Sequence, residues 1–141
     1  MMAKSSGDDI TISSSLDHIA AVDEFLEEWL RRQNIPEDTI ADLAIAVTEL
    51  VNNAIKHGNK GNLAKKVTVS LHFANGVAQA TVGDEGEGFD PESIPNPIAE
   101  ENLLKAIGRG IFIVKSLMDK VEFAFPATGG TRITITKKVV N

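Results

Sequence analysis

The stretch from Pro36 to about His57 constrains the fold more than any other part of the sequence. Its pattern predicts a helix: the proline suits a first turn, two acidic residues follow it at the positive end, and Gly58 is placed to cap the C-terminus. The middle, residues 43–47 (LAIAV), is apolar on nearly every side. Such a helix is poorly suited to water, so we expect it to be buried inside a layered domain.

The rest of the chain predicts strands and two further helices around this one. Asn75-Gly76 is a strong hairpin turn between two alternating runs. We expect a single domain over residues 1–141, an α/β (α+β) two-layer sandwich whose mixed, mostly antiparallel sheet is covered on one face by helices. The expected helices are Leu16–Gln33 and about Arg109–Met118, and the expected strands are residues 10–12, 66–73, 77–82, 121–125 and 131–138.

Composition narrows the class of protein. The 141 residues include no cysteine, which excludes disulfides, thiolate catalysis and cysteine-ligated zinc. No apolar run approaches the ~20 residues of a membrane helix, and residues 1–9 lack the apolar core of a signal peptide. We therefore expect a cytoplasmic protein. A net charge of -6 disfavours direct binding to nucleic acid, although it leaves room for a single nucleotide.

The buried helix carries an unexpected polar stripe. Glu49 and Asn53 are four residues apart, so they share one helix face, and His57 continues that face a turn later. Magnesium prefers oxygen ligands and keeps its waters and a substrate's phosphates, so the amide oxygen of Asn53 is a candidate ligand. Glu49 is a candidate general base. A solvent-facing polar edge on the helix is an equally good interpretation of this pair alone.

A glycine-rich acidic loop follows the strand ending at Val82. Asp84 is placed to accept a hydrogen bond from an exocyclic amine, and Gly86 and Gly88 permit close approach to a flat ligand. A plain surface loop is the alternative. A calcium loop is a weaker one, because the spaced pattern and terminal glutamate of an EF-hand are missing. From Asp84 to Asn102 no period is visible, which favours a functional lid.

Two further glycine motifs come later in the chain. Gly108-Arg109-Gly110-Ile111 opens a helix, where exposed amides form an anion site. It is neither a Walker loop nor a dinucleotide fingerprint, and an ordinary helix start is the alternative. Gly129-Gly130-Thr131 alone is a hairpin turn.

In this order the motifs resemble those of the GHKL (Bergerat-fold) ATPase superfamily, over about Ile10 to Lys138. The resemblance implies that ATP and Mg²⁺ are bound. Asn53 would be the magnesium ligand, Glu49 the general base and Asp84 the adenine-reading residue. The other residues implied at the nucleotide are Thr131, which assists Asp84, Gly86 and Gly88 around the base, Gly108, Gly110 and Ile111 at the phosphates, and Lys105 or Arg109 as the nearby cation.

Two runs resemble one branch of that superfamily, the anti-sigma factor serine/threonine kinases. They are ELVNNAIKHGN from residue 49 and GRGIFIV from residue 108. The larger GHKL ATPases need a second domain, for which the chain leaves no room before Asn141, and His18 lacks the pattern around a phosphoacceptor histidine. The branch implies transfer of the γ-phosphate to a STAS-type antagonist, binding of a sigma factor and a homodimer. By the same resemblance, the first strand and helix, with Asp17, Glu24 and Glu28, are the candidate surface for dimer or sigma factor contact.

Two hypotheses besides the kinase remain open. The first is a non-catalytic ATP-binding module that sequesters a regulatory partner. Glu49 favours the kinase, because a module that only binds has no need of a base. A fragment of a larger regulator is the second hypothesis, which Met1 and the opening strand argue against.

Overall fold

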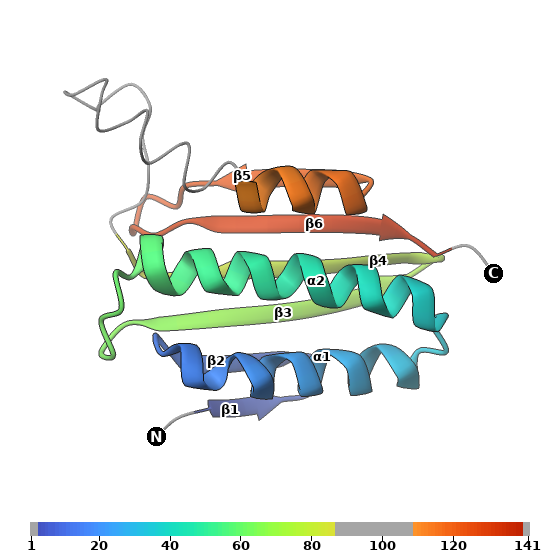
Figure 1. The fold of residues 1–141 in the computed structure, drawn as a ribbon, viewed down its shortest axis with the longest axis horizontal. Coiled ribbons are helices and arrows are strands. Elements are labelled where there is room, and N and C mark those ends of the chain that lie inside the picture. The colour runs from blue at the N-terminus through green and yellow to red at the C-terminus, as the bar shows by residue number, and fades with distance from the viewer. Residues whose placement is uncertain (1–2, 87–108, 140–141) are drawn as a thin grey trace.

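A six-stranded antiparallel sheet forms one layer of the protein (Figure 1). The computed structural model describes residues 3–86 and 109–139. The strand order across the sheet is β1-β2-β3-β4-β6-β5, and every pairing is antiparallel, so the mixed pairing that we expected is not found among these strands. The strands are β1 (Ala3–Ser6), β2 (Asp9–Ser13), β3 (Lys66–Ala74), β4 (Val77–Gly83), β5 (Lys120–Ala124) and β6 (Arg132–Lys138).

The helices form the second layer, on one face of the sheet (Figure 1). A 3-10 turn (Leu16–His18) leads into α1 (Ile19–Arg32), and α2 (Glu37–Asn53) continues into a π-helical turn (Ala54–Gly58). Residues 109–117 form the last helix. The two-layer sandwich predicted from the sequence is thereby confirmed. Among the described residues, no helix is both long enough and apolar enough to cross a bilayer.

Alternation along the strands builds the core between the two layers. In β3 the buried residues Val67, Val69 and Leu71 alternate with more exposed ones, which is the pattern of a strand with one covered face. On the other face, hydroxyl groups of neighbouring strands form hydrogen bonds: Oγ1 of Thr81 lies 3.0 Å from Oγ1 of Thr134. The Asn75-Gly76 turn has positive φ at both positions, as the predicted hairpin requires.

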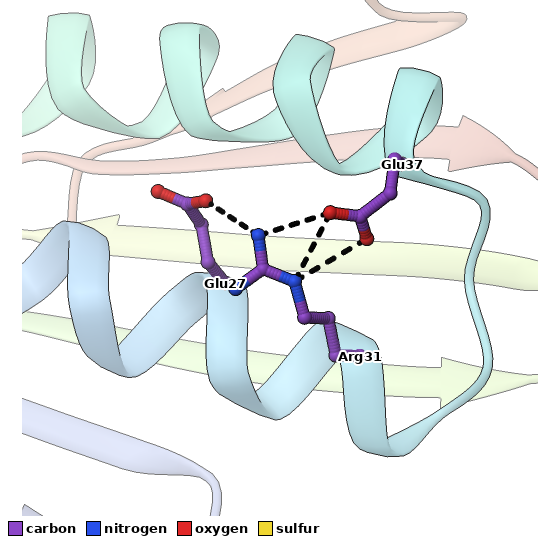
Figure 2. Close-up of polar contacts among 3 residues, drawn as sticks. All are labelled: Glu27, Arg31 and Glu37. Atoms are coloured by element: carbon purple, nitrogen blue, oxygen red, sulfur yellow. Dashed lines mark hydrogen bonds and ion pairs between the residues drawn. The ribbon is translucent and has the colours of Figure 1, made fainter.

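Polar contacts attach the helices to one another and to the sheet. Arg31 of α1 bonds to Glu27 on its own helix and to Glu37 at the start of α2, at 3.1 and 3.0 Å (Figure 2). These groups are exposed, so water and salt weaken the attraction. At the opposite edge, Lys137 of β6 donates to the carbonyl of Leu117 at 2.7 Å and holds the end of the last helix.

Several local predictions were wrong. The strand over residues 10–12 does not open the sheet, because β1 precedes it and pairs with β2. Nor is α2 buried on all sides: Ile45, in its apolar middle, is 48% exposed. Pro36 lies one residue before the first turn of α2, at the N-cap. Gly58 does not cap the helix with a positive φ; it is the last residue of the π-helical turn, and Asn59 is the C-cap.

Candidate nucleotide-binding site

Two polar side chains of α2, the carboxylate of Glu49 and the amide of Asn53, lie against Gly110 in the last helix. A Cβ atom added to Gly110 would stand 2.8 Å from Glu49 Oε2 and 2.9 Å from Asn53 Nδ2. A side chain at this position would have to displace both groups. The structure therefore brings together Glu49, Asn53 and Gly110, which are far apart in the sequence. A general base and a magnesium ligand are two of the groups needed around a phosphate chain.

The Asn53 amide is the clearest sign of a ligand at this end. Its Nδ2 atom is buried and is the one buried side-chain polar atom without a hydrogen-bond partner among the described residues. A buried amide without a partner is costly in a finished protein core, and it is ordinarily satisfied by a ligand or ordered water. The amide has both an oxygen that suits Mg²⁺ and a nitrogen that suits a phosphate oxygen, so the residue fits the groups that the sequence implied.

Asp84 forms a second cluster, at the end of β4. Its Oδ1 atom accepts hydrogen bonds from the amides of Gly86 at 2.9 Å and Thr131 at 3.1 Å. Its own amide donates to the carbonyl of Thr131 at 3.0 Å. Asp84 and Thr131 are thus adjacent, as the sequence predicts. Oδ2 receives no hydrogen bond from the described residues and has the capacity to accept one from an exocyclic amine.

Glycines allow the chain to pack closely around this carboxylate. A Cβ atom on Gly58 would overlap Oδ2 of Asp84, and one on Gly86 would overlap the carbonyl of Gly58. Gly130 lies against the carbonyl of Asp84 with a φ of +83°, a conformation that strongly favours glycine. The carboxylate is therefore enclosed by main chain from three segments of the protein.

Burial raises the pKa of the Asp84 carboxyl above its ordinary value. The amides of Gly86 and Thr131 and the charge of Lys65 oppose this effect and favour the ionised form. A raised pKa means that the carboxylate is destabilised in the free protein, so a ligand that donates a hydrogen bond to it relieves part of that cost.

The π-helical turn joins the two clusters. Asn53 ends α2 and Gly58 ends the turn, roughly 7 Å apart along a helix axis. The turn is held by a bond from the Asn59 amide to the carbonyl of Ala54 at 2.8 Å, which spans five residues instead of four. Such turns often occur at functional sites.

Comparison with known proteins agrees with this arrangement. The family described as "Histidine kinase-like ATPase domain" matches residues 12–137, which include both clusters. The chain belongs to the histidine kinase-like ATPase domain family. The superfamily resemblance drawn from its motifs is thereby confirmed.

Curated relatives of this ATPase domain include proteins named "Serine-protein kinase RsbW". The protein of Listeria innocua is 30% identical over 114 residues, covering 77% of this chain and 71% of its own. That of Staphylococcus aureus is 27% identical over 146 aligned residues, covering 99% of this chain and 91% of its own. These similarities agree with the predicted serine kinase branch.

Solved structures show the same fold. The RsbU and RsbW domains of Rv1364c from Mycobacterium tuberculosis match with a TM-score of 0.68 at 23% identity, over 93% of this chain and 31% of that one. The histidine kinase domain of the blue-light activated kinase from Erythrobacter litoralis matches with a TM-score of 0.56 at 18% identity, over 91% and 62% of the two chains.

Other residues predicted for the ATPase site stand as follows. Arg109 is exposed at the start of the last helix, and Ile111 is partly buried against the core. Gly88, Lys105 and Gly108 lie outside the described residues, as does most of the segment that we expected to form a lid.

Sequence reasoning missed two residues that shape the ATPase site. Gly58 was interpreted as a helix cap, although its role is to leave room for the Asp84 carboxylate. Asn59 was not singled out, yet it is only 2% exposed and bonds to the loop after β4. A buried asparagine inside a polar loop has no periodic signal, and its partners are distant in the sequence.

Proposed function

We propose that this chain is an ATP-dependent serine/threonine protein kinase that phosphorylates an anti-sigma antagonist of the STAS type and also binds a sigma factor. The observation that carries the proposal is the position of Glu49 and Asn53 against Gly110. A module that only binds ATP has use for Asn53 and Gly110, but not for a carboxylate beside them. The relatives named serine-protein kinases support the same choice. We further propose a homodimer located in the cytoplasm.

In this proposal the chain's own residues work mainly by positioning and charge. Asp84 and Thr131 orient the adenine, and the amides near Gly110 bind the phosphates. Asn53 holds the metal. Bound ATP with Mg²⁺ supplies the phosphoryl group and neutralises part of its charge. Glu49 accepts the proton of the partner's serine or threonine hydroxyl as that oxygen becomes the nucleophile.

The test is phosphoryl transfer from labelled ATP to candidate antagonist proteins of the same genome. Glu49→Gln keeps the shape of the side chain and removes the base, so transfer should fall by roughly 10²–10⁴-fold. ATP affinity should change little. The matched control is Glu122→Gln, the same substitution at an exposed position of β5. Tight ATP binding without transfer to any antagonist would replace the kinase with a sequestering module.

A further inference from the structure

We propose that Asn59 is a positioning residue that fixes Asp84 for recognition of the adenine amine. The inference rests on the proposed nucleotide site. Asn59 does not touch the expected position of the base; it acts through the loop that carries Asp84. Its role is therefore to set the selectivity for the base and not to take part in phosphoryl transfer.

The Asn59 side chain is held in a single orientation. Its Nδ2 atom donates to Ser14 Oγ at 2.8 Å and to the carbonyl of Lys66 at 3.0 Å. Its Oδ1 atom accepts from the amide of Glu85 at 2.9 Å. Both N–H groups and the oxygen have partners, so rotating the amide by 180° would break all three bonds. Ser14, also 2% exposed, is fixed in turn by its bond to the carbonyl of Lys65.

A second tether acts on the same loop. The Glu85 carboxylate accepts a hydrogen bond from the amide of Lys66, the first residue of β3. Glu85 is therefore held through its main chain by Asn59 and through its side chain by β3. These two tethers hold the main chain between Asp84 and Gly86, whose amide donates to Asp84 Oδ1.

The consequence for Asp84 follows from the packing. Gly58 packs so closely against Oδ2 of Asp84 that a Cβ atom would overlap it, and Asn59 is the next residue along the chain. The end of the π-helical turn thus contacts both the carboxylate and the loop beside it. Loss of the Asn59 side chain would leave the Glu85 amide without its partner and would loosen the loop from which the Gly86 amide donates to Asp84. The site then loses part of its preference for ATP over a nucleotide that lacks the adenine amine.

A nucleotide pair that differs only at this amine tests the proposal. Purine riboside triphosphate has a hydrogen atom where ATP has the amine. The ratio of the two dissociation constants, measured by titration of each nucleotide, therefore reports the adenine contact alone. For Asn59→Ala we expect the preference for ATP to fall by about tenfold, the equivalent of one hydrogen bond. In the phosphoryl transfer assay, KM for ATP should rise while kcat stays close to that of the wild type.

Two other variants keep the test decisive. Glu85→Ala cuts the second tether at an exposed position, so it should fold even if Asn59→Ala does not, and we expect a loss of preference of roughly threefold. Asn62→Ala is the matched control. Asn62 also accepts from a main-chain amide, that of Ala64 at 3.0 Å, but it does not touch the Asp84 loop. The preference of the Asn62→Ala variant for ATP should equal that of the wild type.

A readout without nucleotide separates this inference from the proposed function. The amides of Gly86 and Thr131 both donate to Asp84 Oδ1, and neither bonds to Asn59. Their hydrogen exchange should accelerate in Asn59→Ala and Glu85→Ala, but not in Asn62→Ala. If the wild type bound neither nucleotide, the proposed function would fail. Unchanged exchange, or an unchanged preference for ATP in both tether variants, would overturn the role of Asn59.

Discussion

At the scale of single residues, the site depends on positions where a side chain is absent. Gly110, Gly58 and Gly86 each stand where a Cβ atom would meet a functional group or the main chain that holds it. Glycine is thus required here for close approach, and its tolerance of unusual backbone angles is secondary. Glu49, Asn53 and Asp84 can keep their positions in the site because the neighbouring glycines have no side chain that would displace them.

Gly110→Ala tests this requirement at the phosphate end. The added methyl group would lie within 3 Å of both Glu49 and Asn53 and would displace them. We expect ATP affinity to fall by at least about tenfold, since interactions with the phosphates depend on that approach. Isothermal titration with ATP measures the effect.

Gly83→Ala is the control for that substitution. A Cβ atom on Gly83 meets nothing within 4 Å, and its φ is not positive. ATP affinity should therefore remain close to that of the wild type. A similar loss of affinity in both variants would show that the approach of Gly110 to Glu49 has no special role.

At the scale of elements, α1 contains a carboxyl group, that of Asp23, whose pKa is raised well above its ordinary value. Partial burial, followed by the hydrogen bond and charge of Glu27, raises the pKa of Asp23 to about 6, while Arg31 opposes the rise. In the unfolded chain this carboxyl has a pKa near its ordinary 3.8. The stabilising effect of protonation is therefore complete below that value and is lost as the pH rises through about 6.

Asp23→Asn should consequently stabilise the protein at pH 7. Because Asp23 is only partly buried, screening reduces the effect, and we expect a rise in Tm of roughly 2–4 °C. The gain should disappear near pH 4. Thermal unfolding followed by circular dichroism at both pH values measures it. Glu24→Gln, which removes the same charge from the exposed face of α1, should show no such pH dependence.

The elements also show which parts of the structure can be predicted from sequence. The hairpin between β3 and β4 was found because Asn75-Gly76 permits its backbone angles locally. In contrast, β1 was missed because Ala3–Ser6 has no apolar alternation, and only its pairing with β2 makes it a strand. The π-helical turn was missed for a similar reason: it depends on packing against the Asp84 loop, which local propensity does not encode.

At the scale of the whole molecule, packing of the helices on the sheet brings Asp84 of the sheet close to Gly58 at the end of the π-helical turn. The core between sheet and helices holds α2 in position, and the end of α2 carries Asn53 and the turn to Gly58. The inner face of α2 is buried while Ile45 faces outward. The site therefore depends on a core that covers only part of this helix.

Two substitutions in α2 compare its inner and outer faces. Leu50 is 1% exposed, so Leu50→Ala should leave a cavity and lower the free energy of unfolding by roughly 2–5 kcal/mol. Ile45→Ala, on the exposed side, should lower it by less than about 1 kcal/mol. Urea unfolding measures both changes. Equal losses would mean that α2 is covered on all sides, as its sequence alone predicts.

The site as a whole was predicted in type but not in detail. The order of its motifs was enough to expect Glu49, Asn53, Asp84 and Thr131 around a nucleotide, because each motif is short and local. The contacts between motifs were not predictable in the same way. Asn59 bonds to Ser14, 45 residues earlier in the chain, and to Glu85, 26 residues later, and such pairs are brought together only by the fold.

We propose that Asp84 reads adenine in a nucleotide site shared by the sheet and α2. Titration of ATP into the wild type and into Asp84→Asn tests it most directly. The asparagine keeps the size of the side chain and its bonded oxygen but loses the negative acceptor. We predict that ATP binds the wild type and that affinity falls by at least about tenfold in the variant. Equal affinity in the two proteins, or no ATP binding by the wild type, would contradict this account.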